Sequence, residues 1–211
     1  MKLIYFDIQA RGESTRMALA HARAQYEDCR IKMEDWPAYK AEHANDLPNG
    51  QVPVWCQNGE TFAESLAILR LVGKQFGYYP AEYEEQWQAD ALTDYANDFI
   101  ATFVTIVFFE KKHDEEGQQR YKEALEKMCA HLEKHLAHGK DFLVGDKLTI
   151  ADFHVASVLF AHVFNDSYIA GAAFTDIGKA VVARHSKFAA YIERMRNQLS
   201  HYLATRPAAP L

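Results

Sequence analysis

The stretch KLIYFDIQARGESTRMALA, residues 2–20, joins a short apolar strand to an Arg-Gly turn and the start of a helix. Residues 2–6 are β-branched and aromatic, which favours a strand, and apolar positions recur at helical spacing from Glu13 to Gln25. Tyr5 therefore lies near the carboxyl end of the strand, where α/β folds bind ligands. The next helix offers free N–H groups and a positive dipole end to an anion. A phenol there can contact a small anionic ligand, although a tyrosine in a strand is more often a core residue.

The composition predicts an ordinary soluble globular protein. The 211 residues are 49% hydrophobic and 25% charged, which suits one good core or two small ones. The net charge of -6 disfavours a nucleic acid or an anionic membrane as a partner. The first residues do not resemble a signal peptide, and we expect no apolar run near the ~20 residues of a membrane helix. These patterns predict a cytoplasmic protein.

Cysteines and histidines give no clear metal site. The chain has three widely spaced cysteines, Cys29, Cys56 and Cys129. This pattern fits neither a disulfide framework nor a paired-cysteine metal site, so we expect reduced, buried thiols. Three histidines share one helical face, His131, His135 and His138. Glutamate and lysine residues surround them and favour a solvated face, so we expect no metal.

Residues 1–76 alternate between strand and helix patterns. We expect strands at 2–6, 28–33, 53–57 and 60–62, helices at 13–24 and 64–76, and a loop at 34–50. The strongest local signal is Asn58-Gly59, which predicts a hairpin turn between the last two strands. The order predicts a small βαβ unit followed by ββα.

The rest of the chain reads as helical. Residues 77–83 contain Gly77 and Pro80 and break the alternation, so we expect a linker there and a helical domain over 84–211. Helices are expected near 83–112, 118–138, 150–165, 175–183 and 187–203. The run 98–109 is apolar on nearly all sides, which indicates a helix buried on several faces.

Residues 148–153 carry the pattern of a helix start. Thr149 is suited to the N-cap with Asp152 as its capping-box partner, and Leu148 and Phe153 are placed as a hydrophobic staple. Because a capping box satisfies backbone donors, we assign Asp152 to folding rather than to catalysis.

A proline at the start of a strand, in Gln51-Val52-Pro53, is a second candidate ligand contact. A cis bond before Pro53 would let Val52 present its N–H and C=O to an extended peptide-like ligand. X-Pro bonds are mostly trans in folded proteins, so these residues alone favour an ordinary trans bond on an edge strand.

Two further pairs offer contacts for carboxylates. Glu64-Ser65 precedes a periodic helix, where a serine hydroxyl and free N–H groups can bind an anion, although a simple N-cap is commoner. Trp36 and Lys40 lie one helical turn apart and offer an indole donor and a point charge. They are equally well explained as a surface pair.

Together these motifs resemble the cytosolic glutathione S-transferases, most closely the sigma class with its helminth members and the haematopoietic prostaglandin D synthases. The resemblance spans essentially the whole chain and rests on segments 5–16, 35–40, 51–53, 64–68, 145–152 and 202–207. It implies an α/β thioredoxin-like, glutathione-binding N-terminal domain at 1–76 and an all-α C-terminal domain. It also implies a homodimer and a cis bond before Pro53, which overturns the expectation of a trans bond.

The resemblance also implies how glutathione would bind. The implied set is Tyr5, Arg11, Trp36, Lys40, Gln51, Val52, Pro53, Glu64, Ser65 and Asp98. The sulfur would lie at Tyr5 with help from Arg11, and the cysteinyl backbone would pair with Val52. The γ-glutamyl carboxylate would lie at Ser65, and the glycyl carboxylate near Trp36 and Lys40.

Two positions of this implied set, Asp98 and Glu64, differ from the others in what the resemblance implies. Asp98 would reach across the dimer to the γ-glutamyl ammonium in the partner's site. The family usually has glutamine where this chain has Glu64, which adds a negative charge near the γ-glutamyl carboxylate.

The implied activity is conjugation of the glutathione thiolate to hydrophobic electrophiles, with Tyr5 as hydrogen-bond donor to the sulfur. The electrophile would occupy an apolar cleft between the domains, and the candidates are Phe6, Ile100, Phe103 and Val107, each equally plausible as core. Such chemistry implies a role in detoxification.

Three alternatives to conjugation exist for a chain with these motifs. Prostaglandin D synthase activity is less favoured, because Thr105 and Asn97 stand where those enzymes have a large aromatic and an acidic residue. Disulfide exchange is excluded, because residues 7–12 contain no cysteine. A non-catalytic ligand-binding or structural member of the same fold stays open.

Overall fold

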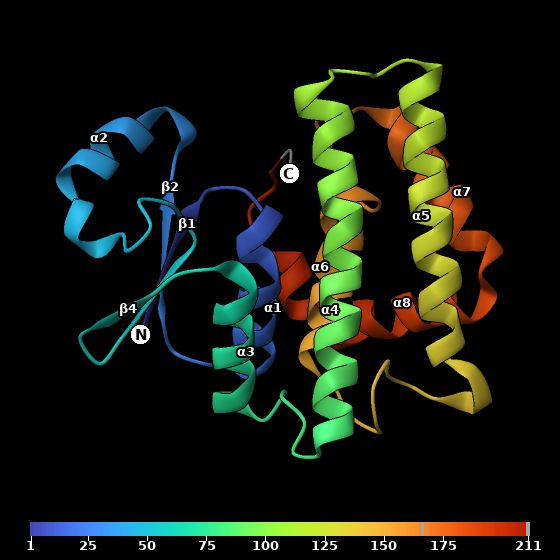
Figure 1. The fold of residues 1–211 in the computed structure, drawn as a ribbon, viewed down its shortest axis with the longest axis horizontal. Helices are drawn as coiled ribbons and strands as arrows, with labels where there is room; N and C mark the ends of the chain where they lie inside the picture. Colours follow the sequence, from blue (N-terminus) through green and yellow to red (C-terminus); the bar gives the residue numbers. More distant parts are fainter. Residues whose placement is uncertain (166, 210–211) are drawn as a thin grey trace.

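The structure is a computed structural model that describes residues 1–165 and 167–209. A sheet with helices on both faces lies beside a bundle of helices (Figure 1). Two helices of the sheet domain, α1 and α3, lie between the sheet and the bundle, whereas α2 covers the opposite face (Figure 1). The expected division into an α/β part and a helical part is present in this arrangement.

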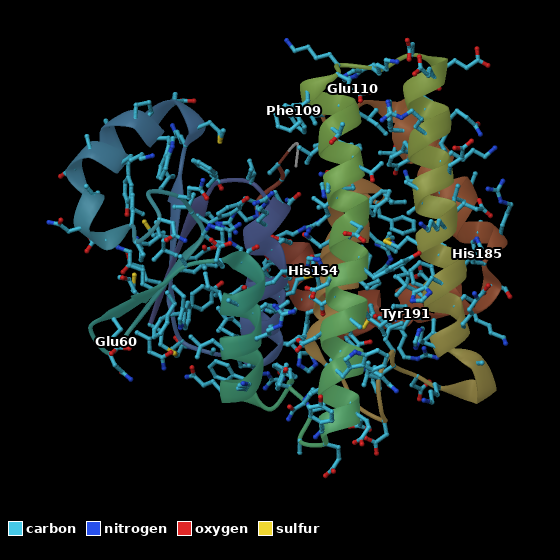
Figure 2. The ribbon with its side chains drawn as sticks, viewed as in Figure 1. Glu60, Phe109, Glu110, His154, His185 and Tyr191 are labelled. Atoms are coloured by element: carbon cyan, nitrogen blue, oxygen red, sulfur yellow. The ribbon has the colours of Figure 1, made fainter. Side chains whose placement is uncertain are left out.

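The described residues form a four-stranded sheet of order β2-β1-β3-β4. The strands are β1 (Lys2–Phe6), β2 (Glu27–Ile31), β3 (Val54–Gln57) and β4 (Glu60–Phe62). β1 and β2 are parallel, with Tyr5 opposite Arg30, and the other two pairings are antiparallel. Asn58 and Gly59 both have positive φ, 54° and 83°, as a tight hairpin turn requires. The predicted hairpin is confirmed, and Glu60 lies at its outer end (Figure 2).

The sheet domain contains α1 (Glu13–His21), α2 (Trp36–Glu42) and α3 (Ser65–Phe76). The expectation of a loop over 34–50 is wrong, because α2 lies within it, flanked by the 3-10 helices Met33–Asp35 and Ala44–Asp46. None of the α2 residues, all of which are described, is buried. Only Trp36 and Tyr39 of this helix pack against the sheet, and two half-buried residues are too few to produce a periodic apolar pattern.

The helical domain begins with α4 (Tyr83–Val104), which continues as a π-helix over Thr105–Phe109. The other helices are α5 (Glu115–His135), α6 (Ile150–His162), α7 (Ala172–Arg184), α8 (Ser186–Gln198) and α9 (Ser200–Thr205). The helix expected at 187–203 is therefore two helices that meet at Leu199. Phe109 and Glu110 lie where the π-helix ends (Figure 2).

The middle of the helical domain is α6, every residue of which is buried. The predicted capping box of Thr149 and Asp152 is confirmed at its start. The buried carboxylate of Asp152 accepts hydrogen bonds from the backbone N–H of Leu143 at 3.0 Å and from the hydroxyl of Tyr191 at 3.0 Å. These partners are structural, which agrees with the assignment of Asp152 to folding.

One stretch, Tyr83–Phe109, is long and apolar enough to cross a membrane when judged by length and composition alone. The expectation that no run approaches this length was therefore wrong. Core helices of soluble proteins pass the same test, and 44% of this apolar window is buried in the structure, where α4 contacts α5 and α6.

Candidate active site

Tyr5 ends the buried part of β1 and is held against a short turn, the 3-10 helix Ala10–Gly12. The Tyr5 side chain is 4% exposed, and its hydroxyl oxygen accepts the backbone N–H of Arg11 at 3.1 Å. Gly12 lies so close to the ring that a Cβ there would be 2.5 Å from Cδ1 of Tyr5. Within the described residues, no hydrogen bond takes up the phenolic hydrogen itself. Tyr5 is therefore fixed in place and can donate its hydrogen to a ligand.

The protonation state of Tyr5 also suits a donor. Burial raises the pKa of the Tyr5 phenol, and the hydrogen bond from Arg11 and the charges of Arg11 and Arg16 only partly oppose this. The phenol is thus protonated at neutral pH. It acts by donating a hydrogen bond rather than by removing a proton.

Arg16 ties the end of β1 to the segment that follows it. Its guanidinium is completely buried and lies 5.5 Å above the ring centroid of Tyr5. It donates to the carbonyl oxygens of Ile8 at 2.6 Å and Phe6 at 3.1 Å, and to the carboxylate of Asp28 at 3.0 Å. The sequence marked Arg16 only as part of a motif, and its contacts give it a role in fixing Tyr5.

Most of the expected glutathione contacts line one cavity, which we call the cradle. Its lining residues are Arg11, Asn49, Gln51, Val52, Pro53, Ala63, Glu64 and Ser65. The Val52-Pro53 bond is cis, as the family resemblance implies. Asn49 is a cradle residue that sequence reasoning did not select, although it directly precedes the motif around Val52.

The far end of the cradle is formed by the start of α3. Glu64 occupies the N-cap position and Ser65 is the first helical residue, so Ser65 is not itself the cap. Glu64 has φ of 69°, a conformation that is costly for a residue with a side chain and that clusters at ligand sites. The side-chain amide of Asn49 donates to the Glu64 carboxylate at 2.9 Å and holds it at the rim.

Trp36 and Lys40 lie on α2, next to the cradle. The Lys40 ammonium is 5.8 Å from the Trp36 ring centroid, and a Cβ on Gly50 would lie 3.3 Å from that ammonium nitrogen. Lys40 is therefore beside the loop that carries Gln51. The ring of Phe6 stands edge-on to Trp36, with 5.3 Å between centroids, and extends this wall from β1 to α2.

The structure separates Asp98 from these residues. Asp98 is exposed on α4 and lines a different cavity, between α4 and α5, together with Tyr95 and Lys127. None of the residues around that cavity is part of the cradle. A role for Asp98 in glutathione binding within its own subunit has no support in this geometry.

The four candidates for an electrophile site have different surroundings. Phe6 and Ile100 are half-buried, whereas Phe103 is 1% exposed and Val107 is 4% exposed. The Phe103 ring packs against the rings of His162 and Tyr168 at 4.8 and 5.2 Å between centroids. Phe103 and Val107 thus belong to the hydrophobic core, which is one of the two alternatives that the sequence left open. A helix that is apolar on all sides does not reveal which side faces the core.

The histidine face on α5 does not form a metal site among the described residues. The rings of His131 and His135 lie 5.3 Å apart, and the side chain of His138 is outside the described part of the chain. Cys129 is a free, buried thiol, and Cys29 and Cys56 are free and partly buried.

Known proteins with similar sequences and structures identify the family of this chain. Residues 1–74 match the family model of the glutathione S-transferase N-terminal domain, and residues 97–206 match that of the C-terminal domain. Glutathione S-transferase 1 of Ascaris suum is 33% identical over 99% of this chain and 98% of its own length. Hematopoietic prostaglandin D synthase of Homo sapiens is 35% identical over 72% of this chain and 74% of its own length.

Among solved structures, a monomeric glutathione S-transferase from the hookworm Necator americanus superimposes with a TM-score of 0.83. It is 28% identical, and the match covers 100% of this chain and 98% of that one. The sheet domain with its cis bond before Pro53 and the bundle beside it are thus the thioredoxin-like and helical halves of one known fold. By its two domain matches and its full-length relative, the chain belongs to the glutathione S-transferase family.

Proposed function

We propose that this protein conjugates the glutathione thiolate to hydrophobic electrophiles, with Tyr5 donating a hydrogen bond to the sulfur. The observation that carries the proposal is the state of the Tyr5 hydroxyl. It is protonated, its oxygen accepts the Arg11 N–H at 3.1 Å, and no hydrogen bond within the described residues takes up its hydrogen. Tyr5 does not itself line the cradle but adjoins it through Arg11, which does.

We place glutathione in the direction that the family resemblance implies. Its sulfur lies at Tyr5 and its cysteinyl backbone pairs with Val52, beside Gln51 and Pro53. Its γ-glutamyl carboxylate meets the N–H groups at the start of α3, at Ser65, where the helix dipole favours an anion. Asn49 donates to Glu64, and we expect the Glu64 carboxylate to accept from the γ-glutamyl ammonium. Its glycyl carboxylate lies near Trp36 and Lys40.

Thiol ionisation explains only part of the expected rate. A thiol with a pKa of about 8.5 is only ~3% ionised at pH 7, and lowering that pKa by about two units takes ~2.7 kcal/mol. One or two hydrogen bonds to a charged sulfur supply this much. Because nucleophilicity falls with pKa, the ~25-fold gain in thiolate becomes roughly threefold in rate. The larger share comes from holding the electrophile beside the sulfur.

The finer assignments rest on the relatives. We assign the chain to the sigma class, with detoxification in the cytoplasm as its setting, from its likeness to nematode transferases and to a prostaglandin D synthase. We also propose a homodimer in which the exposed Asp98 contacts the partner's glutathione. One structural neighbour is described as a monomer, so this fold does not by itself require a dimer.

The first experiment follows thioether formation from glutathione and chlorodinitrobenzene with the native chain and with Tyr5→Phe. We expect the native chain to be active and Tyr5→Phe to lose at least tenfold, of which about threefold comes from the smaller thiolate population and the rest from a sulfur that the hydroxyl no longer holds in place. Tyr78→Phe is the matched control, because it removes a hydroxyl that contacts His21 outside the cradle. Glutathione binding without turnover by the native chain would make the protein a carrier and refute the conjugation proposal.

A second candidate is prostaglandin D synthase activity, which the human relative favours. Isomerisation of the prostaglandin endoperoxide, measured beside the conjugation assay, separates the two.

A further inference from the structure

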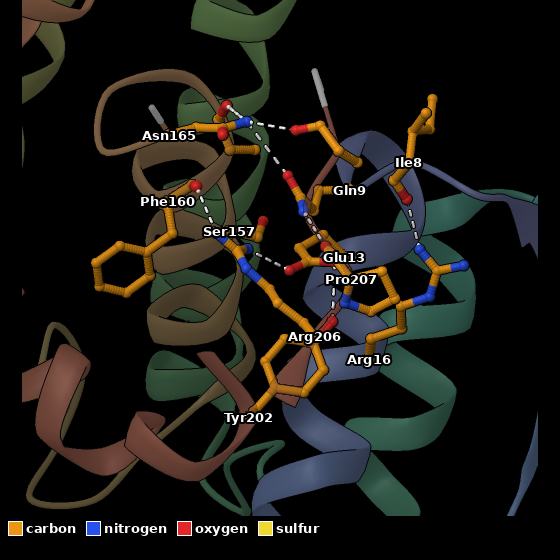
Figure 3. A network of polar contacts seen from close by, with 12 residues as sticks. Ile8, Gln9, Glu13, Arg16, Ser157, Phe160, Asn165, Tyr202, Arg206 and Pro207 are labelled. Atoms are coloured by element: carbon orange, nitrogen blue, oxygen red, sulfur yellow. Dashed lines mark hydrogen bonds and ion pairs between the residues drawn. The ribbon is translucent and has the colours of Figure 1, made fainter. Parts of the chain in front are cut away.

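The turn that holds Tyr5 is fastened at both ends to the C-terminal part of the chain (Figure 3). The turn is the 3-10 helix Ala10–Gly12, and the residues that flank it are Gln9 and Glu13. Both flanking side chains are buried, with 3% and 0% exposed. Their partners lie more than 150 residues further along the chain.

Glu13 holds two residues of the C-terminal segment. One of its carboxylate oxygens accepts from Nη1 of Arg206 at 2.6 Å, and the other accepts from the hydroxyl of Tyr202 at 2.9 Å. Nη2 of Arg206 donates to the carbonyl oxygen of Phe160 at 2.8 Å. Arg206 therefore links the start of α1 directly to α6, the centre of the helical domain.

Gln9 makes the equivalent connection at the other end of the turn. Its amide nitrogen donates to the carbonyl oxygen of Pro207 at 3.0 Å, and its amide oxygen accepts from the side chain of Asn165 at 3.3 Å. The same Asn165 nitrogen also donates to the carbonyl oxygen of Ala209 at 3.0 Å. We call Tyr202, Arg206 and Pro207 the clasp, because they hold both flanks of the turn.

The turn between these flanks needs an external support. Ala10 has φ of 25°, a left-handed conformation that a residue with a side chain adopts only when its surroundings enforce it. No side-chain hydrogen bond caps this 3-10 helix, all of whose residues are described. Arg11, the next residue, must direct its N–H to the Tyr5 hydroxyl, and Gly12 must stay against the Tyr5 ring.

We propose that Glu13, Gln9 and the clasp are positioning residues, which keep the turn in the geometry that aims the Tyr5 hydroxyl at the glutathione sulfur. None of them lines the cradle, so they act through Tyr5 and Arg11. This inference rests on the proposed conjugation, and it adds a distant segment of the chain to the machinery that activates sulfur.

The alternative is that the clasp only stabilises the junction between the two domains. A purely structural role lowers thermal stability but leaves the pKa of the bound thiol unchanged. A positioning role raises that pKa, because a misplaced Tyr5 hydroxyl stabilises the thiolate less. The charged groups that act on Tyr5 are Arg11, Arg16 and Glu13. In variants that leave all of these charges in place, a change in the thiol pKa therefore reports a displaced Tyr5 hydroxyl and not a changed charge.

Tyr202→Phe and Arg206→Lys meet this condition. The first removes one hydroxyl, and the second keeps a cation but loses the guanidinium fork that spans Glu13 and Phe160. The matched control is Tyr191→Phe, because the Tyr191 hydroxyl also donates to a buried carboxylate, that of Asp152, away from the cradle. Gln9→Met keeps the side-chain volume at the other flank and removes both of its polar contacts.

The measurement is the pH midpoint of thiolate absorbance in the binary complex with glutathione, together with the pH profile of kcat/KM. We expect Tyr202→Phe to raise the midpoint by about half a unit, which means about threefold less thiolate below it, and Arg206→Lys by about one unit, or about tenfold. Gln9→Met should shift the midpoint in the same direction. The KM for glutathione should stay within about twofold, because the cradle is intact.

The outcomes separate this inference from the proposed function. The positioning role is overturned if all three variants keep the native midpoint while conjugation is intact. It is also overturned if the control Tyr191→Phe shifts the midpoint as much as the variants do. A native chain that binds glutathione without conjugating still reports the midpoint through thiolate absorbance. A native chain that neither binds nor conjugates overturns the proposed function, and the positioning role with it.

Discussion

The two faces of the sheet differ in how firmly they are packed. The face that carries α1 and α3 joins the main hydrophobic core, which continues through α6 into the helical domain. The face under α2 has a separate cluster with Ile4, Ile31, Leu47 and Val54 as its buried members among the described residues. Neighbouring residues of β1 point to opposite faces, so Tyr5 belongs to the first face and Phe6 to the second.

The two faces also contribute different parts of the site: one fixes Tyr5, and the other carries Trp36 and Lys40. The contacts to Tyr5 come from the firmly packed face, where Gly12 and the completely buried Arg16 fix its ring. Trp36 and Lys40 come from the loosely packed face. Activating a sulfur requires placement to a fraction of an ångström, whereas a point charge acts on a carboxylate over a wider range of geometries. The catalytic contact therefore benefits most from firm packing.

The largest expected effect is a loss of unfolding free energy in acid, caused by two histidines in the main hydrophobic core. Burial lowers the pKa of His154 to about 4 and that of His162 to about 4, whereas an unfolded histidine titrates near 6.5. Between these values the unfolded chain binds more protons, so stability rises with pH and is lost as the pH falls. Each histidine contributes roughly 1.4 kcal/mol per pH unit, or about 5 kcal/mol for both at pH 4.5.

Urea unfolding at several pH values measures this loss. Within the described residues, both ring nitrogens of His154 lack a hydrogen-bond partner, so His154→Leu should cost little at pH 8 and should halve the slope below pH 6.5. His43→Leu, on the α2 side, is the control for losing a ring. Burial raises the pKa of Asp152, which acts in the opposite direction, and the comparison of variants cancels it. An unchanged slope in His154→Leu would contradict the prediction.

The next effect comes from adding one methyl group against Tyr5. Gly12 has an ordinary helical conformation, with φ of -83°, so Gly12→Ala acts only through the clash of its Cβ with the Tyr5 ring. We expect a loss of about 1–3 kcal/mol in unfolding free energy and at least a tenfold loss of kcat/KM at a temperature where the variant is fully folded.

Gly73→Ala is the matched control for that substitution. Its Cβ would clash with Ile150 at the contact between α3 and α6, away from Tyr5. It should lose similar stability and keep its activity per folded molecule. Equal activity per folded molecule in Gly12→Ala and Gly73→Ala would contradict the prediction, because it would show that catalysis does not depend on the exact position of the Tyr5 ring.

The fold was predictable where residues have a local reason for their structure. The β-branched and aromatic run of β1, the Asn58-Gly59 turn and the capping box at Thr149 are each specified by neighbouring residues, and all three are confirmed. The helix α2 was missed because only Trp36 and Tyr39 pack against the sheet, which leaves too few apolar positions for a helical period. Residues 187–203 appeared continuous because a break at Leu199 needs no glycine or proline.

The candidate site was predictable along the cradle and not beyond it. Gln51, Val52 and Ser65 belong to short motifs, so the family resemblance located them. Phe103 and Val107 could not be assigned, because the sides of a uniformly apolar helix differ only in what packs against them. The clasp joins Glu13 to Arg206 across 193 positions, and no local pattern connects two such residues.

The smallest expected effect is on the loosely packed side, at Lys40. Lys40→Ala removes an exposed ammonium next to Gly50 from a helix without buried residues among Trp36–Glu42, so stability should stay within about 0.5 kcal/mol of native. We expect the KM for glutathione to rise about threefold to fivefold, or roughly 1 kcal/mol, with kcat within about twofold.

Lys74→Ala is the matched control, since its ammonium also lies over an aromatic ring, 4.9 Å from the centroid of Tyr79, but on α3. A glutathione amide that lacks the glycyl charge should bind the native chain and Lys40→Ala alike. If Lys40→Ala lowered kcat instead and left KM unchanged, the α2 face would take part in sulfur chemistry, and the contrast between the two faces would not hold.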